Sequence, residues 1–335
     1  MNIIYNKIIT LQKLIGKTPL AEISLRYKDH PLKVYSKIEH YNFTGSIKDR
    51  IALYMINNAY INNQIHEKDI IVEATSGNTG ISFAAIGTYL GHKVQIFMPD
   101  WLSIERRKLL ESYNAELILV SKDEGGFIEC VKRSKEYFNK HKNVFLPCQF
   151  CNNDNMLAHY FSTGPEIYNS LQKIGLEPTL FVAGVGTGGT VMGINKYLKE
   201  KNKNVKSYAL EPLNSRTLST GKHTGSHRIQ GISDEFIPDI LDLNSLSGII
   251  GVDDGDSIIM SQMICKKFGL GIGISSGANF LGAIKALEMN NYQGTVVTIF
   301  ADDNKKYVST DLMNNEPVKE NFISTDVELI DINII

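Results

Sequence analysis

Cysteine is scarce in this sequence, with four residues, at positions 130, 148, 151 and 265, in a chain of 335. Small secreted domains that rely on disulfides carry a much higher density of cysteine. Cys148 and Cys151 form one C-x-x-C pair. A zinc site would usually add a second pair or histidines at ligand spacing, and the sequence offers neither. We therefore predict no metal site and interpret the pair as two small, partly buried thiols.

An excess of charge of one sign is also absent. The 35 basic and 36 acidic residues leave a formal net charge of −1, which excludes a general electrostatic affinity for nucleic acid or an anionic membrane. No stretch of about 18 or more apolar residues predicts a membrane-spanning helix. The N-terminus lacks the basic and apolar regions of a secretory signal. These absences predict a cytoplasmic protein without nucleic-acid or membrane partners.

Short apolar runs alternate with longer helical patterns along most of the chain. Ile70–Ala74 and Leu180–Ala183 are typical of strands, and Phe127–His141 has the pattern of an amphipathic helix. This alternation predicts an α/β fold with largely parallel sheets, and the apolar strands fit sheets covered on both faces. The length favours roughly two domains. Residues 211–255 are rich in Gly, Ser and His, so we expect loops there. The tail after residue 311 also lacks a clear pattern, and it could cover a sheet edge, mediate assembly or have no role.

A glycine-rich loop, Gly184–Thr190, lies between a predicted strand and a predicted helix. Backbone N–H groups at a helix N-terminus bind phosphate, and glycine lets the ligand approach the backbone. The loop also matches G-x-G-x-x-G, and Glu211 follows where a dinucleotide-binding site places its ribose-binding acid. An NAD-binding oxidoreductase is therefore one interpretation of this segment.

Two further segments offer chemistry at the start of a helix. Ser46 and Asp49 suit an N-cap and a first helical turn. Lys48 would then lie where the positive helix end disfavours its ammonium form, and a lowered pKa is what a Schiff-base lysine needs. Residues 75–80 follow a predicted strand and offer hydroxyls, an amide and N–H groups that suit a carboxylate.

The order of these motifs resembles the cysteine synthase (O-acetylserine sulfhydrylase) and cystathionine β-synthase family. The similar segments are Ile15–Leu20, Gly45–Arg50, Ser76–Gly80, Gly186–Thr190 and Gly273–Ala278, and the resemblance extends over about residues 10–305. It implies a pyridoxal-phosphate enzyme of fold type II, with two domains that are each a mostly parallel twisted sheet flanked by helices. Residues 1–45 with 152–310 would form the larger, cofactor-phosphate-binding domain, 46–151 the smaller, substrate-carboxylate domain, and 311–335 a tail of unknown role.

The resemblance also assigns roles to individual residues. Lys48 would form the Schiff base with pyridoxal phosphate and then move the Cα proton. Asn78 would bind the cofactor 3′-hydroxyl, and Ser275 would contact the pyridine nitrogen. The cofactor phosphate would be bound by Gly186, Thr187, Gly188, Gly189 and Thr190. The substrate carboxylate would be held by Thr75, Ser76, Thr79 and Gln149.

A serine beside the pyridine nitrogen predicts the type of reaction. Ser275 supplies no negative charge to keep that nitrogen protonated, so the ring is a poorer electron sink. Loss of the β-substituent is then favoured over persistence of a carbanion at Cα. The expected reaction is β-replacement on a serine- or cysteine-type amino acid through an aminoacrylate intermediate. The family further implies a homodimer, and some members bind the C-terminus of serine acetyltransferase.

One segment departs from the cysteine synthase pattern. Ser233, Asp234 and Glu235 stand where cysteine synthases carry a small, glycine-rich run. Two carboxylates there would repel hydrosulfide, and either could act as general base on water or a thiol. This suggests an alternative, a cysteine-consuming, hydrogen-sulfide-releasing enzyme that gives L-serine or lanthionine, with Asp234 activating the nucleophile and Glu235 as second choice. The competing interpretation is that both acids are merely solvated.

Overall fold

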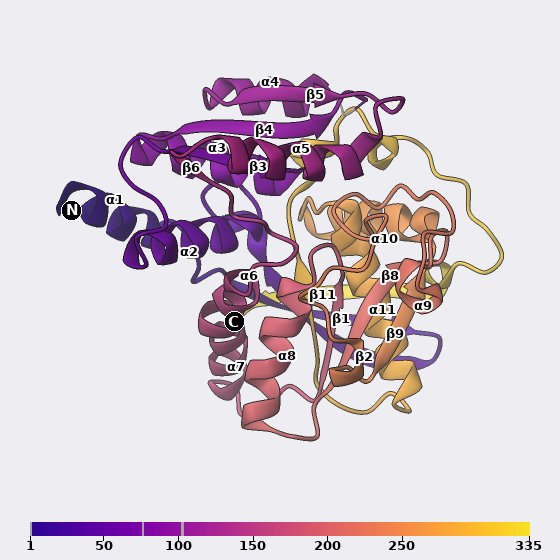
Figure 1. The fold of residues 1–335 in the computed structure, drawn as a ribbon. Helices are drawn as coiled ribbons and strands as arrows, with labels where there is room; N and C mark the ends of the chain where they lie inside the picture. Colours follow the sequence, from indigo (N-terminus) through magenta and orange to yellow (C-terminus); the bar gives the residue numbers. More distant parts are fainter. Residues whose placement is uncertain (1, 76, 102–103) are drawn as a thin grey trace. The chain divides into compact units, whose positions relative to one another are not determined.

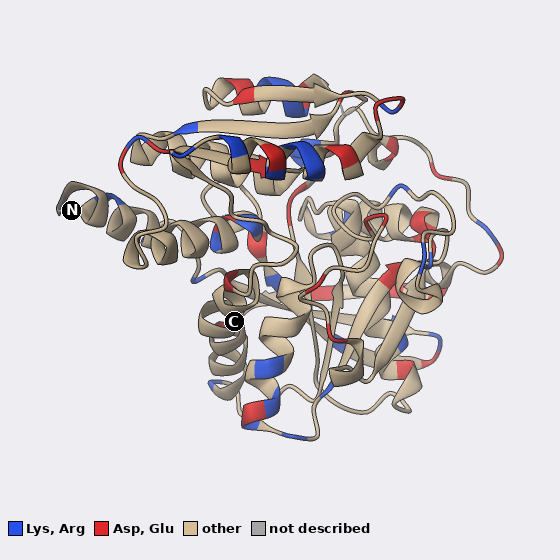
Figure 2. Cartoon of the chain, viewed as in Figure 1, with Lys and Arg blue, Asp and Glu red and all other residues tan. Residues whose placement is uncertain are grey.

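The computed structural model describes residues 2–75, 77–101 and 104–335. The chain divides into two compact units, which we describe one at a time. The first unit is Met1–Gly16 with Asn42–Ala158, and the second is Lys17–Tyr41 with His159–Ile335. Within the described ranges, none of the helices combines the length and the apolar character that crossing a bilayer requires. Acidic and basic residues are interspersed along the ribbon of both units (Figure 2).

The first unit is built on a parallel four-stranded sheet in the order β5-β4-β3-β6 (Figure 1). Its strands are β3 (Ile70–Ala74), β4 (Lys93–Pro99), β5 (Glu116–Val120) and β6 (Val144–Phe145). Its helices are α1 (Asn2–Gln12), α2 (Lys48–Ile61), α3 (Asn78–Leu90), α4 (Ile104–Ser112), α5 (Gly126–Lys140) and α6 (Asp154–Ala158).

Alternate residues of β4 show how this sheet is covered. Val94 and Ile96 belong to the apolar core that α1, α2 and α3 share. Phe97 instead meets the ring of Tyr137 on α5, with the ring centroids 6.2 Å apart. Since successive strand residues point to opposite faces, α3 and α5 cover the two sides of the sheet. Burial on both faces explains why these strands are almost purely apolar in sequence.

The second unit contains a seven-stranded mixed sheet in the order β11-β1-β2-β10-β7-β8-β9. The strands from β2 to β9 in that order run parallel, and β1 is antiparallel to both of its neighbours. These strands are β1 (Leu20–Tyr27), β2 (His30–Ile38), β7 (Leu180–Gly184), β8 (Lys206–Pro212), β9 (Gly248–Val252), β10 (Val296–Phe300) and β11 (Val327–Ile334).

Helices pack against this second sheet, and α11 (Ile274–Met289) contacts β7, β9 and β10. The other α-helices are α7 (Gly164–Gln172), α8 (Gly189–Lys201), α9 (Thr217–Thr220) and α10 (Asp254–Phe268). A π-helical turn covers His159–Thr163. Short 3₁₀ turns cover Glu39–Tyr41, Leu243–Ser245, Asn304–Tyr307, Asp311–Met313 and Ile323–Asp326.

The predicted α/β fold with largely parallel sheets is confirmed, but one segment differs from the prediction. Residues 211–255, expected as loops, contain α9 and β9. The tail, for which covering a sheet edge was one alternative, ends in β11, which pairs with β1 from Tyr27 opposite Val327 to Ala21 opposite Ile334. Five of the eight residues of β11 are exposed. Such an edge strand carries charges and lacks the apolar run that revealed the central strands.

Each sheet presents one of the expected anion-binding loops at the carboxyl end of a parallel strand. In the first unit, β3 ends at Ala74 and α3 begins at Asn78. In the second unit, β7 leads through residues 185–188 into α8. Open α/β sheets bind ligands at this end of their strands, where loops and helix N-termini gather. Both loops therefore lie at the end of a sheet where ligands are expected to bind.

Candidate active site

Lys48 is the first residue of α2 and is half-buried. The N-cap position belongs to Ile47, so the expected cap by Ser46 is wrong, although Ser46 Oγ accepts a hydrogen bond from the Lys48 backbone N–H at 3.3 Å. Asp49 lies in the first turn as expected. Its buried carboxylate accepts from the backbone N–H of Thr44 at 2.6 Å and from the Thr44 hydroxyl at 2.5 Å. These bonds fix the backbone conformation next to Lys48.

The expected carboxylate-binding residues come together in the first unit. Thr75, Thr79 and Gln149 are all buried. The Thr79 hydroxyl donates to Gln149 Oε1 at 2.7 Å, and Thr75 Oγ1 accepts from the Gly77 backbone N–H at 3.2 Å. Asn78 opens α3 and is half-buried. Ser76 lies outside the described residues. Gln149 reaches this loop from the segment after β6, so a helix N-terminus, hydroxyls and an amide are gathered in one place.

Glu73 is a site residue that sequence reasoning missed. Its side chain lies under the same loop, where Oε1 accepts from the Ala74 backbone N–H at 2.9 Å and Oε2 from the Gln149 backbone N–H at 3.2 Å. Burial raises the pKa of Glu73 to about 7, although backbone hydrogen bonds oppose this shift. The available signal was an acid inside an otherwise apolar strand, since such a residue is rarely buried without partners.

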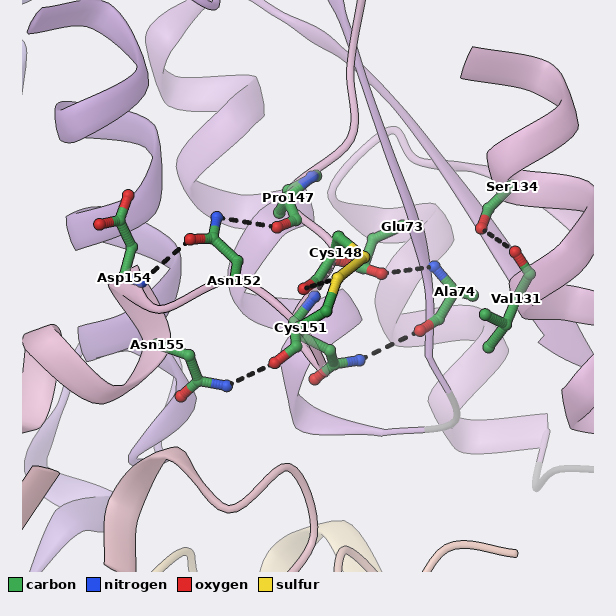
Figure 3. The surroundings of a disulfide bond; sticks show 11 residues. Glu73, Ala74, Val131, Ser134, Pro147, Cys148, Cys151, Asn152, Asp154 and Asn155 are labelled. Carbon is green, nitrogen blue, oxygen red and sulfur yellow. Dashed lines mark hydrogen bonds between the residues drawn. A yellow bond between two sulfur atoms is a disulfide. The ribbon is translucent and has the colours of Figure 1, made fainter. Parts of the chain in front are cut away.

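Cys148 and Cys151 are joined in a disulfide, with their Cα atoms 5.9 Å apart (Figure 3). The interpretation as two thiols is therefore wrong for this pair, whereas Cys130 and Cys265 are free. The Cys148 carbonyl accepts from the backbone N–H groups of Cys151 at 3.1 Å and Asn152 at 3.0 Å, which closes a tight turn. Within the described ranges, no three His, Cys, Asp or Glu side chains are grouped to hold a metal ion.

The glycine-rich loop of the second unit has the geometry of a phosphate site. Gly188 has φ +84° and precedes α8, so the helix begins without a capping side chain at this position. At Gly186 a Cβ would lie 2.5 Å from the carbonyl oxygen of Gly231, so a side chain there would need the backbone to shift. Thr187 is buried. Thr190 Oγ1 lies 3.2 Å from Nε2 of His159, which orients that hydroxyl. Backbone N–H groups at the start of a helix that follows a glycine-rich turn fit a phosphate group.

Ser275 lies on the first turn of α11 and is buried. Asn279, one turn further along, is a second residue that the sequence did not reveal. Its Oδ1 accepts from the Gly184 backbone N–H and its Nδ2 donates to the Ile299 carbonyl, both at 2.7 Å. These bonds tie the helix that carries Ser275 to the start of the glycine-rich loop. The second unit thus brings the glycine-rich loop and Ser275, two of the expected cofactor contacts, to one end of its sheet.

The acidic segment, residues 233–235, runs beside the glycine-rich loop. The Ser233 backbone N–H donates to the Val185 carbonyl at 2.7 Å, and His227 Nε2 lies 3.1 Å from the Ser233 carbonyl oxygen. Asp234 therefore directly follows Ser233, which is hydrogen-bonded to the glycine-rich loop. Asp234 is half-buried and Glu235 is exposed. This placement fits a role for Asp234 better than one for Glu235.

Glu211 has a local structural role. Its Oε2 accepts from the backbone N–H groups of Leu218 at 2.8 Å and Ser219 at 3.3 Å, and the Ser219 hydroxyl also donates to the carboxylate. The carboxylate thus caps α9. Because these bonds occupy Glu211, the NAD interpretation loses the residue that would bind the ribose.

Known proteins similar to this chain point to one family. Residues 11–302 match the family described as pyridoxal-phosphate dependent enzyme. A cysteine synthase from Staphylococcus aureus is 39% identical over 302 residues, which cover 90% of this chain and 96% of that protein. The crystal structure of a hydrogen sulfide-producing enzyme from Fusobacterium nucleatum is 51% identical, covers 99% of both chains and superposes with a TM-score of 0.97.

A second crystal structure of that hydrogen sulfide-producing enzyme carries an aspartate-to-asparagine substitution and contains the α-aminoacrylate intermediate. It is 51% identical to this chain, covers 98% of it and 99% of the variant, and has a TM-score of 0.96. The phosphate-binding geometry of the glycine-rich loop and the helix-terminal Lys48 agree with these similarities. The chain therefore belongs to the pyridoxal-phosphate dependent enzymes, and pyridoxal phosphate is its cofactor.

Proposed function

We propose that this β-replacing enzyme of the cysteine synthase type takes L-cysteine as its first substrate and releases hydrogen sulfide. The observation that carries the proposal is the acidic segment beside the phosphate-binding loop, where Ser233 is bonded to Val185 and Asp234 follows. The 51% identity to a hydrogen sulfide-producing enzyme supports the same choice. That an aspartate-to-asparagine variant of that enzyme holds the aminoacrylate is a further argument for an aspartate acting late in the reaction.

Each residue of the proposed site has a distinct task. Bound pyridoxal phosphate withdraws electrons from the substrate Cα, which allows the β-substituent to leave. Thr75, Thr79 and Gln149 hold the substrate carboxylate through hydroxyl, amide and N–H groups. Lys48 takes the Cα proton and returns it at the end. Asp234 takes the proton from the incoming nucleophile, so that cysteine and water give serine and hydrogen sulfide, or two cysteines give lanthionine and hydrogen sulfide.

The acidic pair also explains the choice of nucleophile. Two like charges about 5 Å apart repel by about 3 kcal/mol at an effective dielectric constant of about 20. Carboxylates at the acidic segment would therefore disfavour an incoming hydrosulfide anion. They would leave neutral water or a thiol unaffected and could deprotonate either one within hydrogen-bond reach. The charge of Asp234 and Glu235 thus favours release of sulfide over its addition.

The test uses purified holoenzyme with L-cysteine alone and measures sulfide, serine, lanthionine and pyruvate. Sulfide with serine or lanthionine is the expected result. The Asp234→Asn variant should lose about 10²-fold or more of that rate, the usual contribution of a general base. The matched control is Glu235→Gln, which removes the neighbouring, exposed charge and should keep most of the rate. Absence of sulfide, with rapid cysteine formation from O-acetylserine and sulfide, would overturn the choice of cysteine in favour of ordinary cysteine synthesis.

Two features of assembly belong to the same proposal. We propose a homodimer, as the resemblance to cysteine synthases implies, and light scattering on the purified holoenzyme tests it. The C-terminal peptide of a serine acetyltransferase is the proposed protein partner, and competition of that peptide with O-acetylserine tests the interaction. The cytoplasmic location stays a prediction from the sequence.

A further inference from the structure

We propose that Glu73 is a positioning residue, whose carboxylate sets the Gln149 side chain in place to bind the substrate carboxylate. The inference rests on the proposed function, because it assumes that Gln149 contacts the substrate. Glu73 itself is 2% exposed and lies beneath the loop, so it acts through Gln149 rather than on the substrate. All the residues involved lie in the first unit.

Gln149 is held at three points by residues 73–79. Its backbone N–H donates to Glu73 Oε2 at 3.2 Å. Its side-chain Nε2 donates to the Ala74 carbonyl at 3.1 Å, and its Oε1 accepts from the Thr79 hydroxyl at 2.7 Å. The latter two bonds orient the amide, whereas the bond to Glu73 fixes the backbone from which that amide extends. Loss of the bond to Glu73 would therefore let the backbone of Gln149 move, and its side-chain Nε2 and Oε1 atoms would move with it.

The hydrogen-bond partners of Glu73 require a carboxylate at this position. Its partners are the backbone N–H groups of Ala74, Gln149 and Cys148, which are all donors. An ionised carboxylate accepts at both oxygens, whereas a glutamine in its place would direct an NH₂ group at one of those donors. A buried N–H left without an acceptor is costly, so the loop would shift to satisfy it.

The protonation state of Glu73 then connects the loop to pH. Burial raises the pKa of Glu73 to about 7, and the backbone donors and the positive charge of Lys135 on α5 oppose that shift. Below this pH the carboxyl group carries a proton and has less capacity to accept. We expect weaker substrate binding at pH 6 than at pH 8 for this reason, a dependence that a neutral side chain at position 73 would lack.

The experiment compares the wild-type holoenzyme with Glu73→Gln. We expect KM for L-cysteine and for O-acetylserine to rise at least about tenfold, with kcat within about threefold. The rise in KM between pH 8 and pH 6 should disappear in the variant. Hydrogen exchange of the cofactor-free protein gives a readout without turnover, because the Gln149 amide should exchange faster in Glu73→Gln. The matched control is Gln95→Met on the neighbouring strand β4, since Gln95 is buried and bonds to Glu116 instead of the loop.

The outcomes separate the two proposals. If the wild type shows no spectral response to any β-substituted amino acid, the proposed function fails. If the wild type responds and Glu73→Gln has unchanged KM, pH profile and amide exchange, the role of Glu73 is refuted alone. Should Glu73→Gln fail to fold, Glu73→Asp keeps the charge but shortens the reach. KM should then rise at least about threefold, and an unchanged KM would again refute the role.

A different observation, the Cys148–Cys151 disulfide, carries a second proposal. We infer that the redox state of this disulfide controls the affinity for the amino-acid substrate. Gln149 lies inside the four-residue loop that the disulfide closes. Cys148 has φ +55°, a left-handed conformation that non-glycine residues seldom adopt, and its carbonyl accepts two backbone N–H groups. The cross-link helps to hold the backbone next to Gln149 in this conformation.

Cys151 is exposed, so a thiol can reach its sulfur. Hydrosulfide, the product of the proposed reaction, would attack Cys151 Sγ, break the bond to Cys148 and leave a persulfide on Cys151 with a thiolate on Cys148. A dithiol reduces the same bond to two thiols and is itself oxidised to a disulfide. Either reaction removes the cross-link and frees the turn around Gln149. Through hydrosulfide, the enzyme's own product would weaken further substrate binding.

The test titrates the holoenzyme with O-acetylserine, which brings no thiol, and follows the cofactor spectrum before and after dithiothreitol. The redox state is verified by mass spectrometry after alkylation. We expect reduction to weaken binding at least about threefold, and Cys151→Ser to match the reduced wild type under both conditions. Cys265→Ser is the control, because Cys265 is free and lies on α10 of the second unit. Equal affinities of verified oxidised and reduced wild type would refute the proposal.

Discussion

The close approach of Gly186 to Gly231 makes cofactor binding sensitive to a single methyl group. In Gly186→Ala the new Cβ would lie 2.5 Å from the Gly231 carbonyl oxygen and 3.4 Å from its carbonyl carbon. Ordinary contact starts near 3.4 Å, so the two backbones must separate by nearly 1 Å. The adjacent 2.7 Å hydrogen bond from the Ser233 N–H to the Val185 carbonyl resists that movement.

The size of the effect follows from two contributions. Overpacking against a rigid neighbour costs about 1–3 kcal/mol, and one lost hydrogen bond to a charged phosphate costs about 1.5–3 kcal/mol. The lower ends of the two ranges sum to about 2.5 kcal/mol, which predicts an increase of at least about fiftyfold in Kd for pyridoxal phosphate. The measurement is a titration of the cofactor-free protein with pyridoxal phosphate, followed by absorbance.

Gly184 provides a matched comparison. A Cβ there would meet the Cγ2 methyl of Ile232 at 2.8 Å, which is a side chain and can be removed. Gly184→Ala should therefore weaken binding less, and Gly184→Ala with Ile232→Ala should recover much of the loss. No side-chain substitution can relieve Gly186→Ala, because its obstacle is a carbonyl group. If Gly186→Ala binds the cofactor as tightly as the wild type, the steric reasoning is wrong.

Three further predictions concern charge and the lysine. Arg228→Met leaves the nearly buried carboxylates of Asp254 and Glu316 without their cation. Urea denaturation should therefore show a loss of about 2 kcal/mol in the free energy of unfolding, a value lowered to allow for the partial exposure of Arg228. Because the pKa of Glu73 rises from 4.5 to about 7 on folding, the native state binds more protons between these values, and stability should fall as pH rises through that window. Glu73→Gln should remove this component of the pH dependence in urea denaturation at a series of pH values. Borohydride reduction of the holoenzyme should attach the cofactor covalently in the wild type but leave Lys48→Ala unmodified by mass spectrometry, with no turnover.

Features encoded by adjacent residues could be predicted from the sequence. Strand β3 was predicted at its observed bounds, and α5 was predicted within one residue at each end. These elements depend on local apolar runs and glycine, which a linear pattern records. The edge strand β11 was missed, because it is defined by pairing with β1 across about 300 residues of sequence and carries little apolar signal of its own.

The supporting residues of the site could not be predicted for the same physical reason. Glu73 is understandable only once Gln149 is seen to donate to it, and Asn279 only once Gly184 is found beside it. The disulfide required the backbone turn at residues 148–151, since a lone C-x-x-C pair also fits free thiols. Likewise, Glu211 matched a ribose-binding acid by spacing, and its hydrogen bonds to residues 218–219 overturned that interpretation.

Glu73 and Asn279 have the same structural role in the two units, and this similarity leads to a last prediction. Each is a buried polar side chain that fixes a ligand-binding loop through backbone groups near the carboxyl end of a strand. Because Asn279 supports the phosphate-binding loop, Asn279→Ala should raise Kd for pyridoxal phosphate about tenfold, the equivalent of about 1.4 kcal/mol. At saturating cofactor its KM for the amino acid should stay near the wild-type value, whereas Glu73→Gln should show the reverse pattern. A variant of Asn279 that loses amino-acid affinity while keeping its affinity for pyridoxal phosphate would contradict this division, because the support would then act on the substrate.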